Sequence, residues 1–97
     1  MKKLFISQPM RGKTDEEIIK ERQEAIDRAK KVIGEEVVVL ETFFTDFDGK
    51  SPLSYLAQSL HYLAQADVAM FVGDWKNYRG CRIEHLCATE YGIDRIE

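Results

Sequence analysis

One acidic residue, Glu84, follows a stretch of sequence that would place it where chemistry can occur. The apolar residues 68–72 predict a buried strand, 73–80 predict a loop, and a helix is expected from Cys81 onward. Glu84 would then lie in the first turn of that helix, where backbone N–H groups lack partners and the helix dipole is positive. We therefore expect an ionised carboxylate aimed across the loop, as an anionic nucleophile requires. The same position also suits an acidic residue that only complements the dipole.

The loop 7–13, after a first strand expected at 3–6, is a second candidate for ligand binding. Arg11 and Lys13 supply positive charge before the N-terminus of the next helix, and Gly12 permits close approach to the backbone, so a phosphate or a sugar hydroxyl would fit. Alternatively, the loop is a solvated turn whose cations pair with Asp15 or Glu16. The residues that we select from it as binding candidates are Ser7, Gln8, Met10, Arg11, Gly12 and Lys13.

Two other chemistries have weaker support in these segments. Residues 12–14 fit the end of a nucleotide-binding phosphate loop, but Ser7 stands where that loop needs glycine, and Pro9 has no N–H to donate. For a metal ion, Cys81 and His85 share a helix face, and two ligands are too few for structural zinc. We predict neither a metal nor another cofactor.

Strands and helices are expected to alternate along the chain. Thr14 and Glu17 form a capping box that opens the first helix, and Gly34 ends it. Further strands are expected at 36–40 and 93–96, and a helix begins at residues 51–52. The expected apolar faces are Ile18, Ala25, Ile26, Ala29, Val32 and Ile33 on the first helix and Leu53, Leu56, Leu60 and Leu63 on the second. This order predicts a doubly wound parallel sheet of four strands with helices on both faces and a ligand site at the carboxyl ends of its strands.

Length, charge and cysteine content limit the function classes. A chain of 97 residues predicts one domain, 1–97, and a net charge of -3 without a basic stripe argues against a nucleic-acid partner. No apolar stretch is long enough to span a membrane, and residues 1–3 lead into a strand, unlike a signal peptide. Cys81 and Cys87 lie six apart in one expected helix and would point to different faces, so we expect free thiols and a cytoplasmic protein.

Several short motifs connect this chain with a known group of enzymes. They are Arg11-Gly12 after the first strand, Ala66-Asp67 before the third, and Gly80 four residues before Glu84, followed by Ala88 and Tyr91-Gly92. Through these motifs, which are spread over nearly the whole chain, the sequence resembles the nucleoside 2-deoxyribosyltransferases and the related deoxynucleotide N-hydrolases. Both groups have a small flavodoxin-like fold. It is most similar to an uncharacterised branch from phages and bacteria in which the runs 7–12 and 80–84 recur as a pair.

The resemblance implies that Glu84 is a nucleophile that attacks the anomeric carbon of a deoxyribose and expels the nucleobase. Water or a second base would then complete a hydrolysis or a transfer. It also implies that loop 7–13 binds the 5′ end, where Arg11 and Lys13 would favour a nucleotide over a nucleoside. Further substrate-binding candidates are Ser59, Asp74, Trp75 and Gly80; Trp75 would cover the base or, alternatively, pack on the adjacent helix.

Three positions depart from the pattern of these enzymes. Phe5 replaces a tyrosine that positions the nucleophile, Ser59 replaces an aspartate that assists the leaving base, and Leu86 replaces a glycine after the nucleophile. Asp67 is expected to be a structural hydrogen-bonding residue. A binding or sensing module without catalysis therefore stays open as an alternative, as does a structural protein without a ligand.

The aromatic segment 42–47 is unusual for a surface loop. It would fold over the ligand as a lid or bury against a second subunit. Because members of the resembled group commonly assemble, we expect a homo-oligomer whose partner molecule is a small nucleoside or nucleotide.

Overall fold

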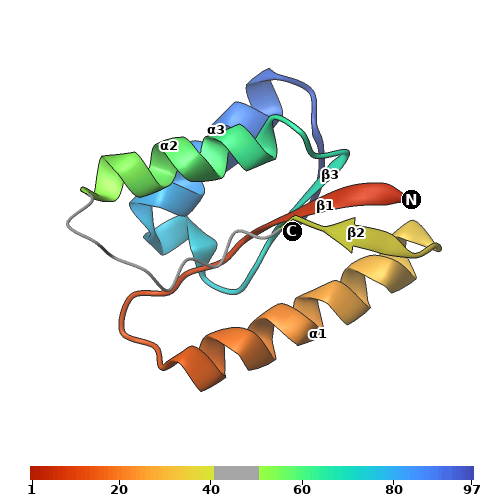
Figure 1. Cartoon of the computed structure of the whole chain (residues 1–97), viewed down its shortest axis with the longest axis horizontal. Coiled ribbons are helices and arrows are strands. Elements are labelled where there is room, and N and C mark those ends of the chain that lie inside the picture. The colour runs from red at the N-terminus through yellow and green to blue at the C-terminus, as the bar shows by residue number, and fades with distance from the viewer. Residues whose placement is uncertain (41–50) are drawn as a thin grey trace.

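The computed structural model describes residues 1–40 and 51–97, and these form an α/β fold. Within them, four parallel strands make one sheet in the order β2-β1-β3-β4. The strands are β1 (Lys2–Ser7), β2 (Val37–Val39), β3 (Val68–Phe71) and β4 (Asp94–Ile96), and the helices are α1 (Asp15–Ile33), α2 (Pro52–Leu63) and α3 (Arg79–Glu90), with a 3-10 turn, η1, at Trp75–Asn77. The helix α1 covers one face of the sheet, and α2 and α3 cover the other (Figure 1). The predicted doubly wound, flavodoxin-like topology is confirmed.

The central strands β1 and β3 end together. In their parallel register Leu4 lies opposite Val68 and Ser7 opposite Phe71. The loops that follow these two strands therefore leave the same edge of the sheet, and all three helices begin on that side (Figure 1). This register explains why the two candidate loops are neighbours, as the sequence predicts.

Successive side chains of β1 point to opposite faces of the sheet, so the strand contributes to two separate parts of the core. Leu4 and Ile6 pack on the α1 side with Ala25 and Ala29 of α1. Phe5 packs on the other side, in a cluster with residues of α2, β3 and α3. Because side chains alternate along a strand, Ser7 shares the face of Phe5 and points toward α2 and α3.

The predicted start and end of α1 are confirmed by its hydrogen bonds. The Thr14 hydroxyl accepts from the backbone N–H of Glu17 at 3.1 Å, and Gly34 ends the helix with a φ of 80°. Such a positive φ favours glycine because other side chains would clash with the backbone.

The structural role predicted for Asp67 is also confirmed, since its carboxylate accepts from the Lys3 N–H at 2.8 Å.

Several predicted boundaries and buried positions are wrong. The helix α3 begins at Arg79, two residues before Cys81. Val32 and Leu53 were expected in apolar faces but are 63% and 71% exposed. Val32 lies at the margin of the buried stripe of α1, and Leu53 lies in the first turn of α2, which extends past the carboxyl ends of the strands (Figure 1). Leu86, which stands in place of a glycine of the resembled enzymes, is also exposed.

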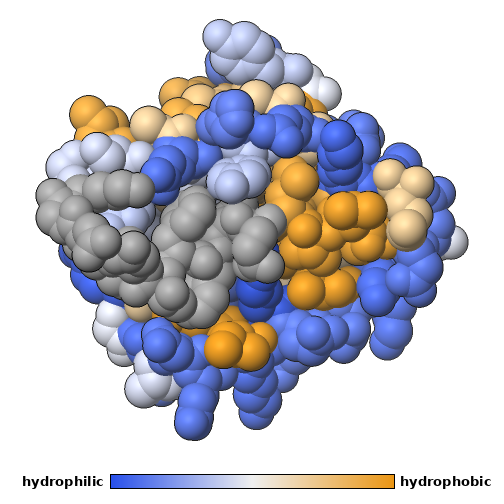
Figure 2. Space-filling model, viewed as in Figure 1, coloured by the Kyte–Doolittle hydropathy of each residue, from blue (hydrophilic) through white to orange (hydrophobic). Residues whose placement is uncertain are grey.

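The face of the molecule drawn in Figure 2 has a hydrophobic patch over β2, an edge strand. Val38 contributes to the exposed apolar surface of that strand. The aromatic segment 42–47, expected to form a lid or a subunit contact, lies outside the described residues, so the homo-oligomer stays a prediction. In the part of the chain that the structure describes, no helix is long and apolar enough to cross a membrane.

Two leucines of α2 provide a matched test of this packing. Leu63 is almost fully buried, whereas Leu53 is exposed in the same helix. We expect Leu63→Ala to lower the free energy of unfolding by about 2–5 kcal/mol, because it leaves a cavity in the core. The control Leu53→Ala should change it by no more than about 0.5 kcal/mol. Urea denaturation measures both, and equal losses would contradict this packing.

Candidate functional site

A buried hydrogen bond joins the two candidate segments of the sequence. The Oγ of Ser7, the last residue of β1, donates to Oε1 of Glu84 in α3 at 2.7 Å. Both residues are buried, with Ser7 1% and Glu84 7% exposed. The strand delivers Ser7 to this side of the sheet, and the spacing Cys81, Glu84, Ala88 directs one face of α3 inward. Two sites selected from distant parts of the sequence are therefore brought together.

The carboxylate of Glu84 has a different environment from the one predicted. Since α3 starts at Arg79, Glu84 is its sixth residue and lies beyond the N–H groups that lack helical partners. Burial raises the pKa of Glu84 to about 7, although hydrogen bonding from Ser7 and Ser59 acts in the opposite direction. The expectation of a carboxylate kept ionised by the helix start is therefore wrong, because desolvation outweighs the favourable contacts. Near neutral pH this group exists in both protonation states.

Side chains from three elements surround this carboxylate, and we refer to Ser7, Ser59, Cys81 and Glu84 as the Glu84 cluster. Ser59 reaches it from α2, and Cys81 lies one turn before Glu84 in α3. Burial raises the pKa of the Cys81 thiol to about 11, so this thiol is neutral and a poor nucleophile at physiological pH. Cys81 and Cys87 are both free, as predicted. Among residues 1–40 and 51–97, no group of three or more candidate ligands could hold a metal ion.

Lys13 lies in a second group of charged residues at the same edge of the sheet. Its Nζ contacts Oε1 of Glu21 at 2.8 Å, and its side chain is 21% exposed. The hydrogen bond to Glu21 raises the pKa of Lys13, and the charge of Asp74 acts in the same direction. Asp15 and Glu16, the partners considered from the sequence, are not the residues that pair with Lys13. The loop after β3 therefore acts on Lys13 through the charge of Asp74.

The other residues of loop 7–13 have separate structural roles. Gln8 is buried and donates from Nε2 to the Ile18 carbonyl of α1 at 2.7 Å, while its Oε1 has no partner among the described residues. Met10 is half-buried, and its backbone carbonyl accepts from the Lys13 backbone N–H at 3.2 Å. This bond closes a turn in which Gly12 has a φ of 79°. Arg11 is exposed. This loop is thus anchored to α1 at Gln8 and turns sharply at Gly12.

Gly80, the second residue of α3, leaves open space beside the helix start. A Cβ at this position would have no heavy atom within 4 Å. Nothing in its packing therefore requires glycine, and its selection as a binding residue rests on the resemblance.

Trp75 packs beneath α3, in the same apolar core cluster as Cys81. It is buried, and its ring stacks on His85 with centroids 4.3 Å apart and an interplanar angle of 21°. Phe71 approaches the same indole at 5.2 Å, and Lys76 Nζ lies 5.7 Å from its ring centroid. The packing role considered from the sequence is the one observed. His85 is half-buried and also contacts the Glu97 carboxylate.

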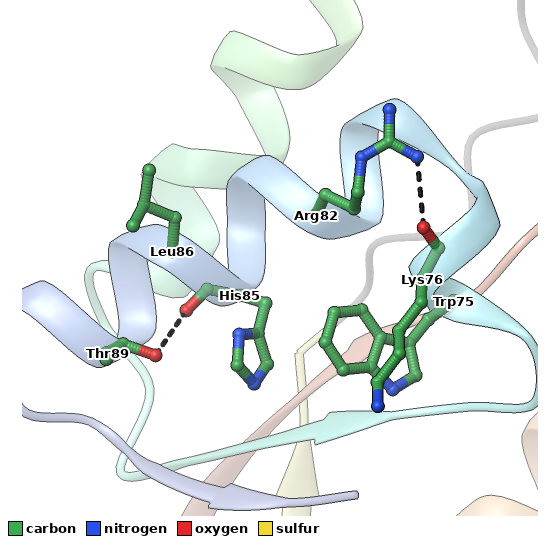
Figure 3. A pocket seen from close by; sticks show the side chains of 6 residues that line it. All are labelled: Trp75, Lys76, Arg82, His85, Leu86 and Thr89. Atoms are coloured by element: carbon green, nitrogen blue, oxygen red, sulfur yellow. Dashed lines mark hydrogen bonds between the residues drawn. The ribbon is translucent and has the colours of Figure 1, made fainter.

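A pocket of about 550 Å³ lies on this Trp75 side of α3 (Figure 3). Arg82 borders it and donates to the Lys76 carbonyl at 3.0 Å. Its lining residues are Trp75, Lys76, Arg82, His85, Leu86 and Thr89. None of them belongs to the Glu84 cluster, so this pocket is distinct from that site.

Sequence reasoning did not select Glu21, the partner of Lys13. The helical period could have pointed to Glu21, because it lies two turns after the helix cap Thr14 and therefore on the same side of α1 as the end of loop 7–13. What the sequence could not show is the fold of loop 7–13, which returns Lys13 over that side of the helix.

Comparison with protein-family models, curated proteins and solved structures found no match to this chain.

Replacing Glu84 should change how stability depends on pH. Because burial raises its folded-state pKa from 4.5 to about 7, the folded protein binds this proton more tightly, and ionisation of Glu84 opposes folding between these pH values. Glu84→Gln removes this penalty, so its stability relative to wild type should rise from pH 4.5 to pH 8, by up to about 3 kcal/mol. Urea denaturation at both pH values measures the change, with Glu90→Gln, an exposed position of α3, as control. An unchanged difference would show that Glu84 has an ordinary pKa.

Proposed function

We propose that this protein binds a nucleoside or nucleotide and cleaves or transfers its N-glycosidic bond, with Glu84 as the nucleophile. The observation that carries the proposal is the 2.7 Å hydrogen bond from Ser7 to the buried Glu84 carboxylate. This pair lies where β1 ends, at the edge of the sheet where doubly wound folds bind ligands. The resemblance of the motifs around both residues to deoxyribosyltransferases and N-hydrolases supports the same chemistry.

The reaction would proceed in two steps at the anomeric carbon. A Glu84 carboxylate oxygen bonds to that carbon while the N-glycosidic bond breaks and its electron pair leaves with the base nitrogen. Water or the nitrogen of a second base then attacks the same carbon, gives its proton to the departed base anion and releases the carboxylate. Two displacements give retained stereochemistry, as in retaining glycosidases. The acceptor in the second step distinguishes a hydrolase from a transferase.

Ser7 supplies the hydroxyl that Phe5 lacks. Phe5 is buried in the core and has no donor, but Ser7 lies two residues further along the same face of β1 and donates to Glu84. This bond fixes one carboxylate oxygen, and the hydroxyl of Ser59 adds a second interaction that favours the ionised form. We propose that Ser7 and Ser59 are positioning residues for the nucleophile. The burial of the carboxylate limits its hydration, which favours attack once the proton is lost.

The proposed reaction is tested by chromatography of free nucleobases. Wild type should release base from one or more members of a panel of deoxynucleosides and deoxynucleoside 5′-monophosphates. Glu84→Gln should reduce this release at least about 10³-fold, because the amide cannot form the covalent intermediate. The control Glu90→Gln removes an exposed carboxylate from the same helix and should retain full activity. Release that is equal in wild type and Glu84→Gln would exclude Glu84 as nucleophile.

A binding or sensing module is the second candidate function. The observation that favours it is the hydroxyl of Ser59 beside Glu84, at the position where the resembled enzymes have an aspartate that assists the leaving base. A hydroxyl is a poor acid at neutral pH, and loss of an acid would slow cleavage by about 10²–10⁴. This candidate is supported if a nucleoside or nucleotide raises the melting temperature while wild type releases no base.

The pH profile of base release tests the role assigned to Ser7. Because the nucleophile must be ionised, kcat/KM should rise with pH and level off above about 7, the pKa of Glu84. Ser7→Ala removes a hydrogen bond that lowers this pKa, so the inflection should move to higher pH. The control Thr89→Ala removes a hydroxyl that bonds within α3 and should leave the inflection in place. A Ser7→Ala profile that coincides with wild type would contradict the positioning role.

A further inference from the structure

The cation of loop 7–13 is already paired with a carboxylate. Lys13 Nζ lies 2.8 Å from Oε1 of Glu21, and both side chains are partly buried, with 21% and 28% of their surfaces exposed. A partly buried pair is weakly screened by solvent and salt. The positive charge of Lys13 is thus already neutralised in part by a carboxylate of the protein, before any ligand binds.

Glu21 also reaches the loop that follows β3. Its second carboxylate oxygen, Oε2, lies 3.9 Å from the position that a Cβ on Gly73 would occupy. Glu21 therefore lies between the two loops at the carboxyl edge of the sheet, with Lys13 on one side and Gly73 on the other. An anionic group placed between these loops would be repelled by the Glu21 carboxylate.

A second carboxylate adds to the negative charge at this point. Asp74 follows Gly73 and lies close enough to Lys13 to raise its pKa. One carboxylate, Glu21, therefore contacts the Lys13 ammonium group and a second, Asp74, acts on it through its charge, so the summed charge of the three residues is negative. Arg11, the other cation of loop 7–13, is exposed at the surface.

This arrangement suits a sugar hydroxyl better than a phosphate. A carboxylate accepts hydrogen bonds and cannot donate them, so the hydroxyl of a sugar can donate to Glu21 while Lys13 donates to the hydroxyl oxygen. A phosphate carries acceptor oxygens and negative charge, and would have to separate Lys13 from Glu21 while approaching Asp74. The same two residues thus favour an uncharged ligand group.

We infer that Glu21 is a specificity-determining residue that restricts the substrate to free nucleosides, with an uncharged 5′-hydroxyl, and disfavours nucleoside 5′-monophosphates. This inference rests on the proposed function, because it places the 5′ end of the substrate between Lys13 and Glu21. It differs from the expectation that Arg11 and Lys13 favour a nucleotide. The difference arises because Lys13 has a carboxylate partner that the sequence did not indicate.

The experiment compares each deoxynucleoside with its 5′-monophosphate as ligand and as substrate. Dissociation constants come from calorimetry, and kcat/KM comes from release of the base. Wild type should prefer the nucleoside, and Glu21→Gln should shift this preference toward the monophosphate by roughly tenfold, the size expected of one charge-assisted interaction. Asp74→Asn should shift it in the same direction and provides a second variant should Glu21→Gln fold poorly. The matched control Glu24→Gln removes an exposed carboxylate from α1 and should leave the preference unchanged.

The results separate this inference from the proposed reaction. A wild-type preference for monophosphates, or a preference that Glu21→Gln and Asp74→Asn leave unchanged, overturns the inference while base release still supports the reaction. The expected shift in dissociation constants without any base release supports the inference and overturns the proposed cleavage. Absence of binding and of release with every member of the panel overturns both.

Discussion

The burial of one carboxylate is the constraint on which the candidate site depends. Removing Glu84 from water disfavours its charge, and the hydroxyls of Ser7 and Ser59 offset only part of that cost, so the pKa of Glu84 stays near 7. These hydroxyls come from β1 and α2, and the carboxylate comes from α3. The position and charge of the proposed nucleophile are therefore set by contacts among three elements on one face of the sheet.

Much of the fold could be predicted because it depends on local chemistry. The hydroxyl of Thr14, the left-handed Gly34 and the apolar run 68–72 each determine a structure within a few residues, and all three were identified correctly. The exposure of Leu53 could not be predicted in this way. Helical periodicity gives the direction of a side chain around the helix but does not show whether the sheet extends far enough to cover that turn.

The site was predicted less completely than the fold. Ser7 and Glu84 were selected, and parallel strand order brought their segments together. The ionisation of Glu84 was predicted incorrectly, because it depends on burial by side chains that are distant in sequence. Trp75 was selected as a ligand contact, yet its ring stacks on His85, since sequence spacing does not reveal which side of α3 an aromatic residue will reach. The pairing of Lys13 with Glu21 likewise depends on how a loop turns back over its helix.

The hydrogen bond between Ser7 and Glu84 also has a consequence for folding, because 77 residues separate its two partners. Contacts between distant residues require closure of long loops, which slows folding. While the chain is being synthesised, β1, α1 and β2 can emerge before α3 exists, leaving Phe5 and Ser7 without their α3 partners. The Glu84 carboxylate therefore acquires its position and its raised pKa only when α3 docks on β1.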